Sequence, residues 1–231
     1  ADQKAVTEGG WNDLLVAGSA KQIHLKIAKG KALDKPVQIL FVQRSNQNLL
    51  SQSIVRIELG ENSQAKLIQN FVSLTSSVVS AHQNALNIST QVHLGTNSYL
   101  NFIQLQNENH KDFHFSRTQF YLQTGAQLLS LDLALGGQLS RHYLETVFLG
   151  ENANAGVYGL TALSKKQHTD HYTFIHHQKG ANQSIQHYKS ILSDESHSVF
   201  RGRVRIEPLA QKANSEQLNN NLLLTKTAHA D

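Results

Sequence analysis

The stretch 149-LGENANAGV indicates the fold, because a similar turn recurs along the chain at a nearly constant spacing. Comparable turns stand at 59-LGENSQAKL, 94-LGTNSYLNF, 122-LQTGAQLLS, 177-HQKGANQSI and 206-IEPLAQKAN. Each turn is followed by a small residue at one place: Ser63, Ser98, Ala126, Ala153, Ala181 and Ala210, separated by 35, 28, 27, 28 and 29 residues. A constant period of this length predicts one structural unit stacked on copies of itself.

The residues around each turn are typical of β-strands, so we predict an all-β solenoid, a β-helix with rungs of about 28 residues. The positions four residues before the small residue are Leu59, Leu94, Leu122, Leu149, His177 and Ile206. We expect Leu94, Leu122, Leu149 and Ile206 to stack in one interior column. Such a column would form the apolar core of the ladder.

The chain divides into a lead-in and a ladder. Residues 1–52 contain an N-terminal lead-in and the first strands, including the alternating stretch 22–28 and the run 37-VQILFV. Residues 53–231 form the predicted β-helix core. No Ser/Gly linker or run of charges separates the two parts, so we expect them to be continuous as one domain.

Composition excludes several classes of function. The net charge is +4, from 21 basic and 17 acidic residues, which is too mild and too dispersed for nucleic-acid binding. The densest basic stretch, Arg201, Arg203 and Arg205, lies on one face of a strand and reads as a solvated face or as a contact to an acidic partner. The chain has no cysteine and no apolar run that spans a membrane, so the cytoplasm is the expected location.

Asparagine and glutamine are common in the strand-like stretches. In stacked rungs a side-chain amide can bond to its copy one strand away, as in cross-β ladders. The other interpretation is that these amides form solvated polar faces, and the sequence does not separate the two.

Histidines cluster in the stretch 168-HTDHYTFIHH. In an extended chain His168, Asp170 and His176 lie on one side, so imidazole and carboxylate groups there are the candidate ligands for a metal. Their spacing is not a recognised ligand pattern, and the alternative is that the histidines stack structurally between rungs. We therefore assign no metal site, with these three residues as its only candidates.

Catalytic signatures are scarce. Asp132, Glu145, Asp170 and Asp194 fall on different rungs and form no column of acids at the repeat period, as a polysaccharide-cleaving β-helix enzyme would need. We find no supported Ser–His–Asp arrangement, no phosphate loop and no nucleotide fingerprint. The sequence therefore predicts a protein that is not an enzyme.

The last third of the chain resembles the SufB/SufD family of iron–sulfur cluster assembly scaffold proteins. The resemblance is carried by 171-HYTFIHHQKGANQSIQHYKSIL and 199-VFRGRVRIEPLAQKANSEQLNNNLLL. The matching residues are His176, Ser184, Tyr188, Lys189, Val199, Phe200, Gly202, Ala210, Gln211, Lys212, Gln217, Asn221, Leu222, Leu223 and Leu224. Earlier rungs match more loosely. The lack of cysteine resembles the SufD branch rather than the SufB branch.

The resemblance implies a right-handed parallel β-helix, flanked in the family by helical segments that bind the ATPase SufC. It also implies a non-catalytic scaffold that works with SufB-like and SufC-like partners in cluster assembly and iron acquisition. Any iron–sulfur cluster would then exist only in the complex, with no cofactor in this chain. The family's Cys-Ser-His segment is expected beyond Asp231, as are its C-terminal helices, so we interpret the chain as a fragment and carry over no functional residue.

Two other functions remain open. One is a carbohydrate-active β-helix enzyme, and the other is an oligomerising module without a site. The final strand-like segment, 219-NNNLLLTKTAHAD, leaves an uncapped rung, so we also expect self-association, such as a homodimer through the C-terminal rungs.

Overall fold

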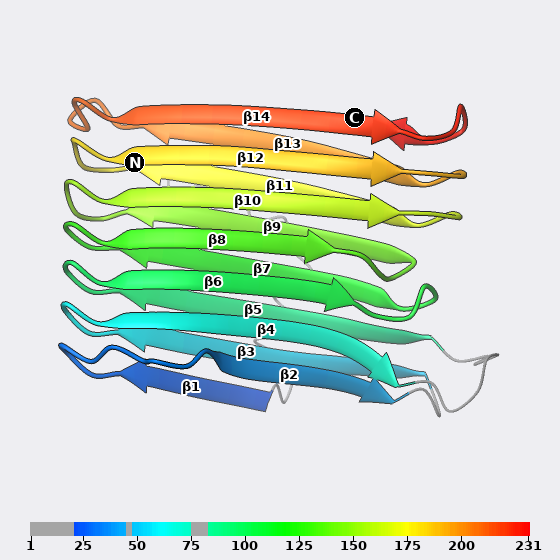
Figure 1. Ribbon diagram of the computed structural model, residues 1–231, viewed down its shortest axis with the longest axis horizontal. Coiled ribbons are helices and arrows are strands. Elements are labelled where there is room, and N and C mark those ends of the chain that lie inside the picture. The colour runs from blue at the N-terminus through cyan, green and yellow to red at the C-terminus, as the bar shows by residue number, and fades with distance from the viewer. Residues whose placement is uncertain (1–20, 45–47, 75–82) are drawn as a thin grey trace, which may run out of the picture.

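The strands of the chain alternate between two parallel sheets that stack rung upon rung, as the computed structural model shows for residues 21–44, 48–74 and 83–231 (Figure 1). The strands are β1 (Lys21–Ile27), β2 (Val37–Arg44), β3 (Leu49–Leu59), β4 (Gln64–Leu74), β5 (Asn84–Leu94), β6 (Tyr99–Asn107), β7 (Phe113–Leu122), β8 (Gln127–Ala134), β9 (Leu139–Phe148), β10 (Asn154–Leu163), β11 (His168–His177), β12 (Gln183–Leu192), β13 (His197–Ile206), β14 (Asn214–Leu223) and β15 (His229–Ala230).

Odd-numbered strands form one sheet in the order β1-β3-β5-β7-β9-β11-β13-β15, and even-numbered strands from β2 to β14 form the other. Every pairing is parallel, and neighbouring rungs are about 29 residues apart, as where Leu139 pairs with His168. This confirms the predicted all-β parallel β-helix, while its right-handed sense stays a prediction. Within the described ranges no helix has the length and apolarity needed to cross a membrane.

The recurring turns have a common backbone conformation. A residue with positive φ comes just before the small residue in four of them: Asn62, Asn97, Gly125 and Asn152. Asparagine and glycine are the residues that adopt this left-handed conformation at least cost. The small residues that follow, Ser63, Ser98, Ala126 and Ala153, are fully buried. The turn signature in the sequence therefore corresponds to a real corner that closes over the core.

Two members of the predicted series, Ala181 and Ala210, are out of phase. Ala210 stands three residues before Ala213, which aligns with Asn182 because Gln183 pairs with Asn214. Ala181 has a φ of 56° and occupies the left-handed position, so the inward place belongs to the next residue, Asn182. The Asn182 side chain can be buried because its amide bonds to backbone groups of its own turn and of the neighbouring turn. Its Nδ2 donates to the carbonyls of Gly150 and Lys179 at 2.9 and 2.8 Å, and its Oδ1 accepts from the Ala153 N–H at 2.7 Å.

The predicted interior column is right in part. Leu94 and Leu122 are adjacent and fully buried, and Ile206 continues the same column at its exposed end. Leu149 was wrongly placed, because Leu122 pairs with Phe148 instead. The turn after β9 (149–153) has one residue more than the turn after β7 (123–126), so counting back four positions reaches the loop.

The ladder begins before Ser53. β1 pairs with β3 and β2 pairs with β4, so residues 21–44 supply a first rung to the same two sheets. The division of the chain at residue 52 stays a prediction about domains, but strand pairing runs across it. Residues 1–20 of the predicted lead-in lie outside the described residues.

Candidate functional site

The three predicted metal candidates lie along β11 and do not converge. His168 Nε2 is 2.6 Å from the Asp170 carboxylate, which also pairs with Arg141 at 2.9 Å. His176 is eight residues further along the same strand, about 26 Å away at the usual rise, and contacts Glu207 at 2.7 Å. One ion therefore cannot bind all three, since their common face extends over the length of the strand.

A column of aromatic and imidazole rings runs through the interior instead. Neighbouring ring centroids lie 4.7–5.2 Å apart along the series Phe41, Phe71, His114, His142, His171, Tyr188 and Phe200. Such spacing is typical of stacked and edge-to-face ring pairs. The middle of the column consists of three consecutive histidines, so the core there is polar.

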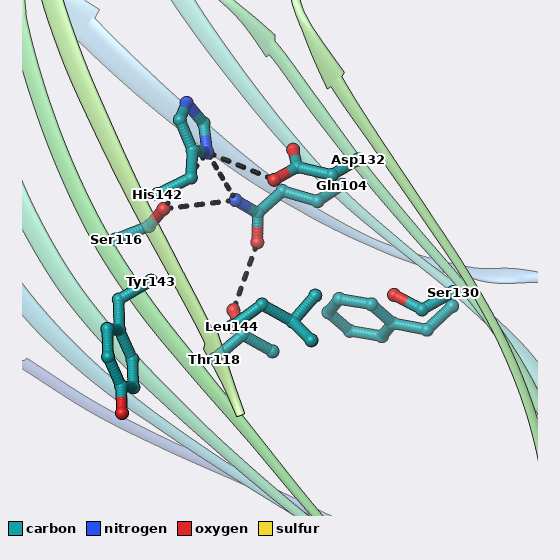
Figure 2. A pocket seen from close by; sticks show the side chains of 9 residues that line it. Gln104, Ser116, Thr118, Ser130, Asp132, His142, Tyr143 and Leu144 are labelled. Atoms are coloured by element: carbon teal, nitrogen blue, oxygen red, sulfur yellow. Dashed lines mark hydrogen bonds and ion pairs between the residues drawn. The ribbon is translucent and has the colours of Figure 1, made fainter. Parts of the chain in front are cut away.

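Asp132 enters this column from the opposite sheet. Its Oδ2 lies 3.2 Å from His142 Nδ1 and 3.6 Å from His171 Nδ1. The exposed fractions are 4% for Asp132, 2% for His142 and 3% for His171, so the whole cluster is removed from solvent. Figure 2 shows the carboxylate directed toward the His142 ring.

Strand alternation explains why these three side chains meet. Asp132 is at an inward position of β8, where buried and more exposed residues alternate. His142 on β9 and His171 on β11 are likewise inward, and the parallel register pairs them directly. Inward side chains of the two facing sheets then share the narrow interior.

Amide and hydroxyl groups surround the Asp132 cluster. Gln104 Nε2 lies 3.2 Å from Ser116 Oγ and 3.3 Å from His142 Nδ1, while its Oε1 accepts from Thr118 at 3.2 Å (Figure 2). These side chains line a cavity of about 10 Å³, which is the size of a single water molecule or small ion.

One other buried glutamine, Gln69, follows the same pattern. Gln69 bonds to Thr90 of the facing sheet at 3.1 Å, as Gln104 bonds to Ser116 and Thr118. The side-chain contacts of Gln69 and Gln104 therefore join the two sheets. They do not run to an identical amide one rung away, as the first interpretation of the Asn and Gln content expects.

The cluster carries its charge on Asp132. Burial favours the protonated acid, but the neighbouring His142, His171 and His114 outweigh it and hold the pKa of Asp132 below its ordinary value. Burial, reinforced by the charge of His142, lowers the pKa of His171 to about 4. Near neutral pH the site is therefore a buried carboxylate that faces at least one neutral imidazole.

The sequence reasoning missed this cluster, since it treated Asp132 as one of several scattered acids and did not single out His142. A usable signal was present in the repeat. His142 and His171 are 29 residues apart, which is one rung, so the period alone places them side by side. The approach of Asp132 from the other sheet had no comparable signal.

The C-terminal end of the ladder is a second notable surface. Val204, Ile206 and Leu223 occupy inward positions of the last full rung, yet they are 36%, 47% and 47% exposed. Among the described residues, β13 has a further strand partner only at His197 and Ser198. Within the described residues up to Asp231, this end of the solenoid therefore has exposed apolar core positions and strand edges that no described strand pairs.

The chain was compared with known proteins. Residues 41–231, which include almost the whole ladder, match the family described as "SUF system FeS cluster assembly, SufBD core domain". The chain belongs to the SufB/SufD core family. This confirms the predicted membership, which rested on the last third of the sequence.

The similar SufB/SufD proteins point to the SufD branch. The chain is 28% identical over 214 residues to the iron-sulfur cluster assembly protein SufD of Escherichia coli (strain K12), which covers 90% of this chain and 49% of that protein. It is 25% identical over 224 residues to the SufBD family protein slr0076 of Synechocystis, and the match covers 94% of this chain and 49% of that protein. A SufD of Plasmodium berghei is 28% identical over 189 residues, and the match covers 82% of this chain and 14% of that protein. The chain thus spans about half the length of the first two relatives.

Proposed function

We propose that the chain is a non-catalytic, SufD-like scaffold subunit of a cytoplasmic Suf complex that assembles iron–sulfur clusters. It works with SufB-like and SufC-like subunits and supports iron acquisition, and the cluster is cargo of the complex. The family match over residues 41–231 carries this proposal, together with relatives that are named as SufD proteins.

The open C-terminal end supports a place for the SufB-like partner. Exposed core positions such as Val204 and Leu223 and the unpaired edge of β14 could continue the ladder into another β-helix. Main-chain pairing across the edge would satisfy backbone donors and acceptors, and the apolar side chains would be removed from water. A partner at this end needs no catalytic residue from this chain.

Co-expression of the full chain with tagged SufB-like and SufC-like proteins of the same organism tests the proposal. We expect all three to purify together. Val204→Glu places a charge on the open end and should release the SufB-like protein. Ile185→Glu is the matched control, because Ile185 is 37% exposed against 36% for Val204 but faces outward on the side of β12. Failure of the unaltered chain to retain either partner would reject the scaffold role.

The same end supports self-association as a second candidate, because one copy could pair its β14 edge with that of another. Light scattering at tens of micromolar, about the concentration at which exposed edges associate, separates the two. A homodimer that Val204→Glu dissociates, without binding to SufB-like protein, would favour an oligomerising module. The carbohydrate-enzyme alternative gains no support, since Asp132 is buried and Asp170 is paired with Arg141.

A further inference from the structure

We propose that Asp132, His142 and His171 bind one divalent transition-metal ion, of the zinc or iron(II) class, inside the β-helix. The sequence led us to expect no metal in this chain, and the three candidates on β11 do not converge. The Asp132 cluster does, because its three donor atoms lie within 4.8 Å of one another. This inference does not depend on the proposed role in a Suf complex.

Two of the three donor separations fit a tetrahedral ion, and all three donor atoms lie within 4.8 Å of one another. Metal–nitrogen and metal–oxygen bonds of about 2.0–2.2 Å place two ligands of a tetrahedral ion about 3.3–3.6 Å apart. The observed separations from Asp132 Oδ2 are 3.2 Å to His142 Nδ1 and 3.6 Å to His171 Nδ1. The ion could be accepted by small side-chain movements without a change in the strands.

The donor chemistry indicates which ion would bind. Two imidazoles and one carboxylate form a ligand set suited to zinc or non-haem iron(II), and less suited to calcium or magnesium, which prefer oxygen. A fourth ligand is available from a water molecule in the adjacent cavity. Gln104 could serve only after its carboxamide turns over, because its Nε2 faces His142 and its Oε1 accepts from Thr118. The charge of Asp132 would also be neutralised in part by the ion.

The hydrogen bonding around His142 points independently to a cation. Its Nδ1 faces Asp132 Oδ2 at 3.2 Å, Gln104 Nε2 at 3.3 Å and Ser116 Oγ at 3.2 Å. A ring nitrogen can donate to the carboxylate or accept from the amide, but it cannot do both. Asp132 Oδ1 is also buried without a hydrogen-bond partner. A metal ion bound between His142 Nδ1 and Asp132 Oδ2 would use a lone pair of each, so the ring would no longer have to donate to the carboxylate.

The surroundings distinguish this cluster from the neighbouring buried pair. His171 has a supporting contact, because its Nε2 lies 3.0 Å from Thr161 Oγ1, as outer-shell partners of ligating histidines do. His114 instead pairs with Glu108 at 2.9 Å, and Gln106 donates to that carboxylate. The His114 pair is a two-group contact with no third ligand, so it serves as the control.

Burial determines how the test must be done. Since the three ligands are at most 4% exposed, an ion has to be captured during folding. The full chain would be unfolded in urea with a chelator, then refolded with zinc, cobalt(II) or, without oxygen, iron(II). Cobalt(II) serves as the spectroscopic probe because its visible bands report tetrahedral nitrogen and oxygen ligation.

After desalting, we expect about one metal equivalent per chain above the amount held by surface histidines, and a visible cobalt(II) spectrum. Asp132→Asn and His171→Gln should each lose that equivalent and the spectrum. His114→Gln should keep both, although it removes a buried histidine of the same column.

Circular dichroism would verify that each variant is folded. If Asp132→Asn or His171→Gln fails to fold, X-ray absorption of the cobalt-loaded unaltered chain decides, since it must show two imidazoles in the first shell. Refolding that leaves less than about half an equivalent, or equal loss in His114→Gln and Asp132→Asn, would overturn the proposal. In that case Asp132 only pairs with the buried histidines His142 and His171.

Discussion

Gly159 makes room for the ring of Tyr188 inside the ladder, and replacing it with alanine tests that packing. Gly159 is an inward residue of β10, and it pairs with Asp132 on one side and Tyr188 on the other. A Cβ added at Gly159 would lie 2.1 Å from Tyr188 Cε1 and 2.2 Å from Cδ1. Ordinary carbon contacts are about 3.5–4.0 Å, so the ring would have to move by more than 1 Å.

The ring has little freedom to move. Tyr188 is 3% exposed, and its ring centroid lies 4.7 Å from Phe200 and 5.2 Å from His171. Overpacking of this kind costs about 1–3 kcal/mol of folding stability. We therefore expect Gly159→Ala to lower the free energy of unfolding by that amount.

A double-mutant cycle isolates the clash. Tyr188→Ala alone should cost about 3–5 kcal/mol, as for other large buried aromatic residues. In the Tyr188→Ala background the added methyl group has space, so Gly159→Ala should cost almost nothing and give a coupling of about 1–3 kcal/mol. Gly156→Ala on the same strand is the control, because its new Cβ would meet the edge of the partly exposed Tyr158 ring at 2.8 Å and Leu129 Cδ1 at 3.4 Å, and not a buried ring.

Urea unfolding followed by far-ultraviolet circular dichroism gives each free energy. The cycle is valid if the free energy of unfolding of each variant falls with urea concentration at the same slope as that of the unaltered chain. Equal cost of Gly159→Ala with and without the Tyr188 ring would refute the packing argument, as would a Gly156→Ala variant that is equally destabilised.

Four other properties of the chain can be tested. Leu122→Asp buries an unpaired carboxylate in the apolar column and should unfold much of the ladder; a melting temperature equal to that of the unaltered chain would contradict the register. Ala181→Gly should stabilise by about 0.5–1 kcal/mol in urea titrations, since Ala181 is held at a φ of 56°. Burial, with the charge of His176, lowers the pKa of His177 to about 4. The unfolded chain then binds more protons below pH about 6.5, so stability should fall from pH 7 to pH 4, and less so in His177→Phe. The chain alone should hydrolyse no ATP, because its sequence has no phosphate loop. It should form no visible-absorbing cluster with iron and sulfide, because it has no cysteine; a stoichiometric chromophore would disprove this.

The repeat could be predicted from sequence because it is a local property. Four of the corners have a left-handed residue and then a small buried residue, and Asn152-Ala153 shows both in adjacent positions. Alternation within strands likewise assigns inward and outward faces without knowledge of the neighbours. The assignment of inward residues failed where the turns differ in length. One extra residue before Ala153 moved Leu149 out of the column, and a similar shift placed Ala181 on the turn.

The solenoid, its period, its corners and the family could be predicted from the residues alone, because they depend on residues that are close in the chain or ordered along it. That Asp132 meets His142 and His171 became visible only in the folded chain. Residues in one sheet meet through the rung period, whereas contacts between the sheets depend on how the two sheets are staggered across the interior. That stagger is set by the summed lengths of the turns and by packing of the whole core. Side-chain alternation alone does not encode it.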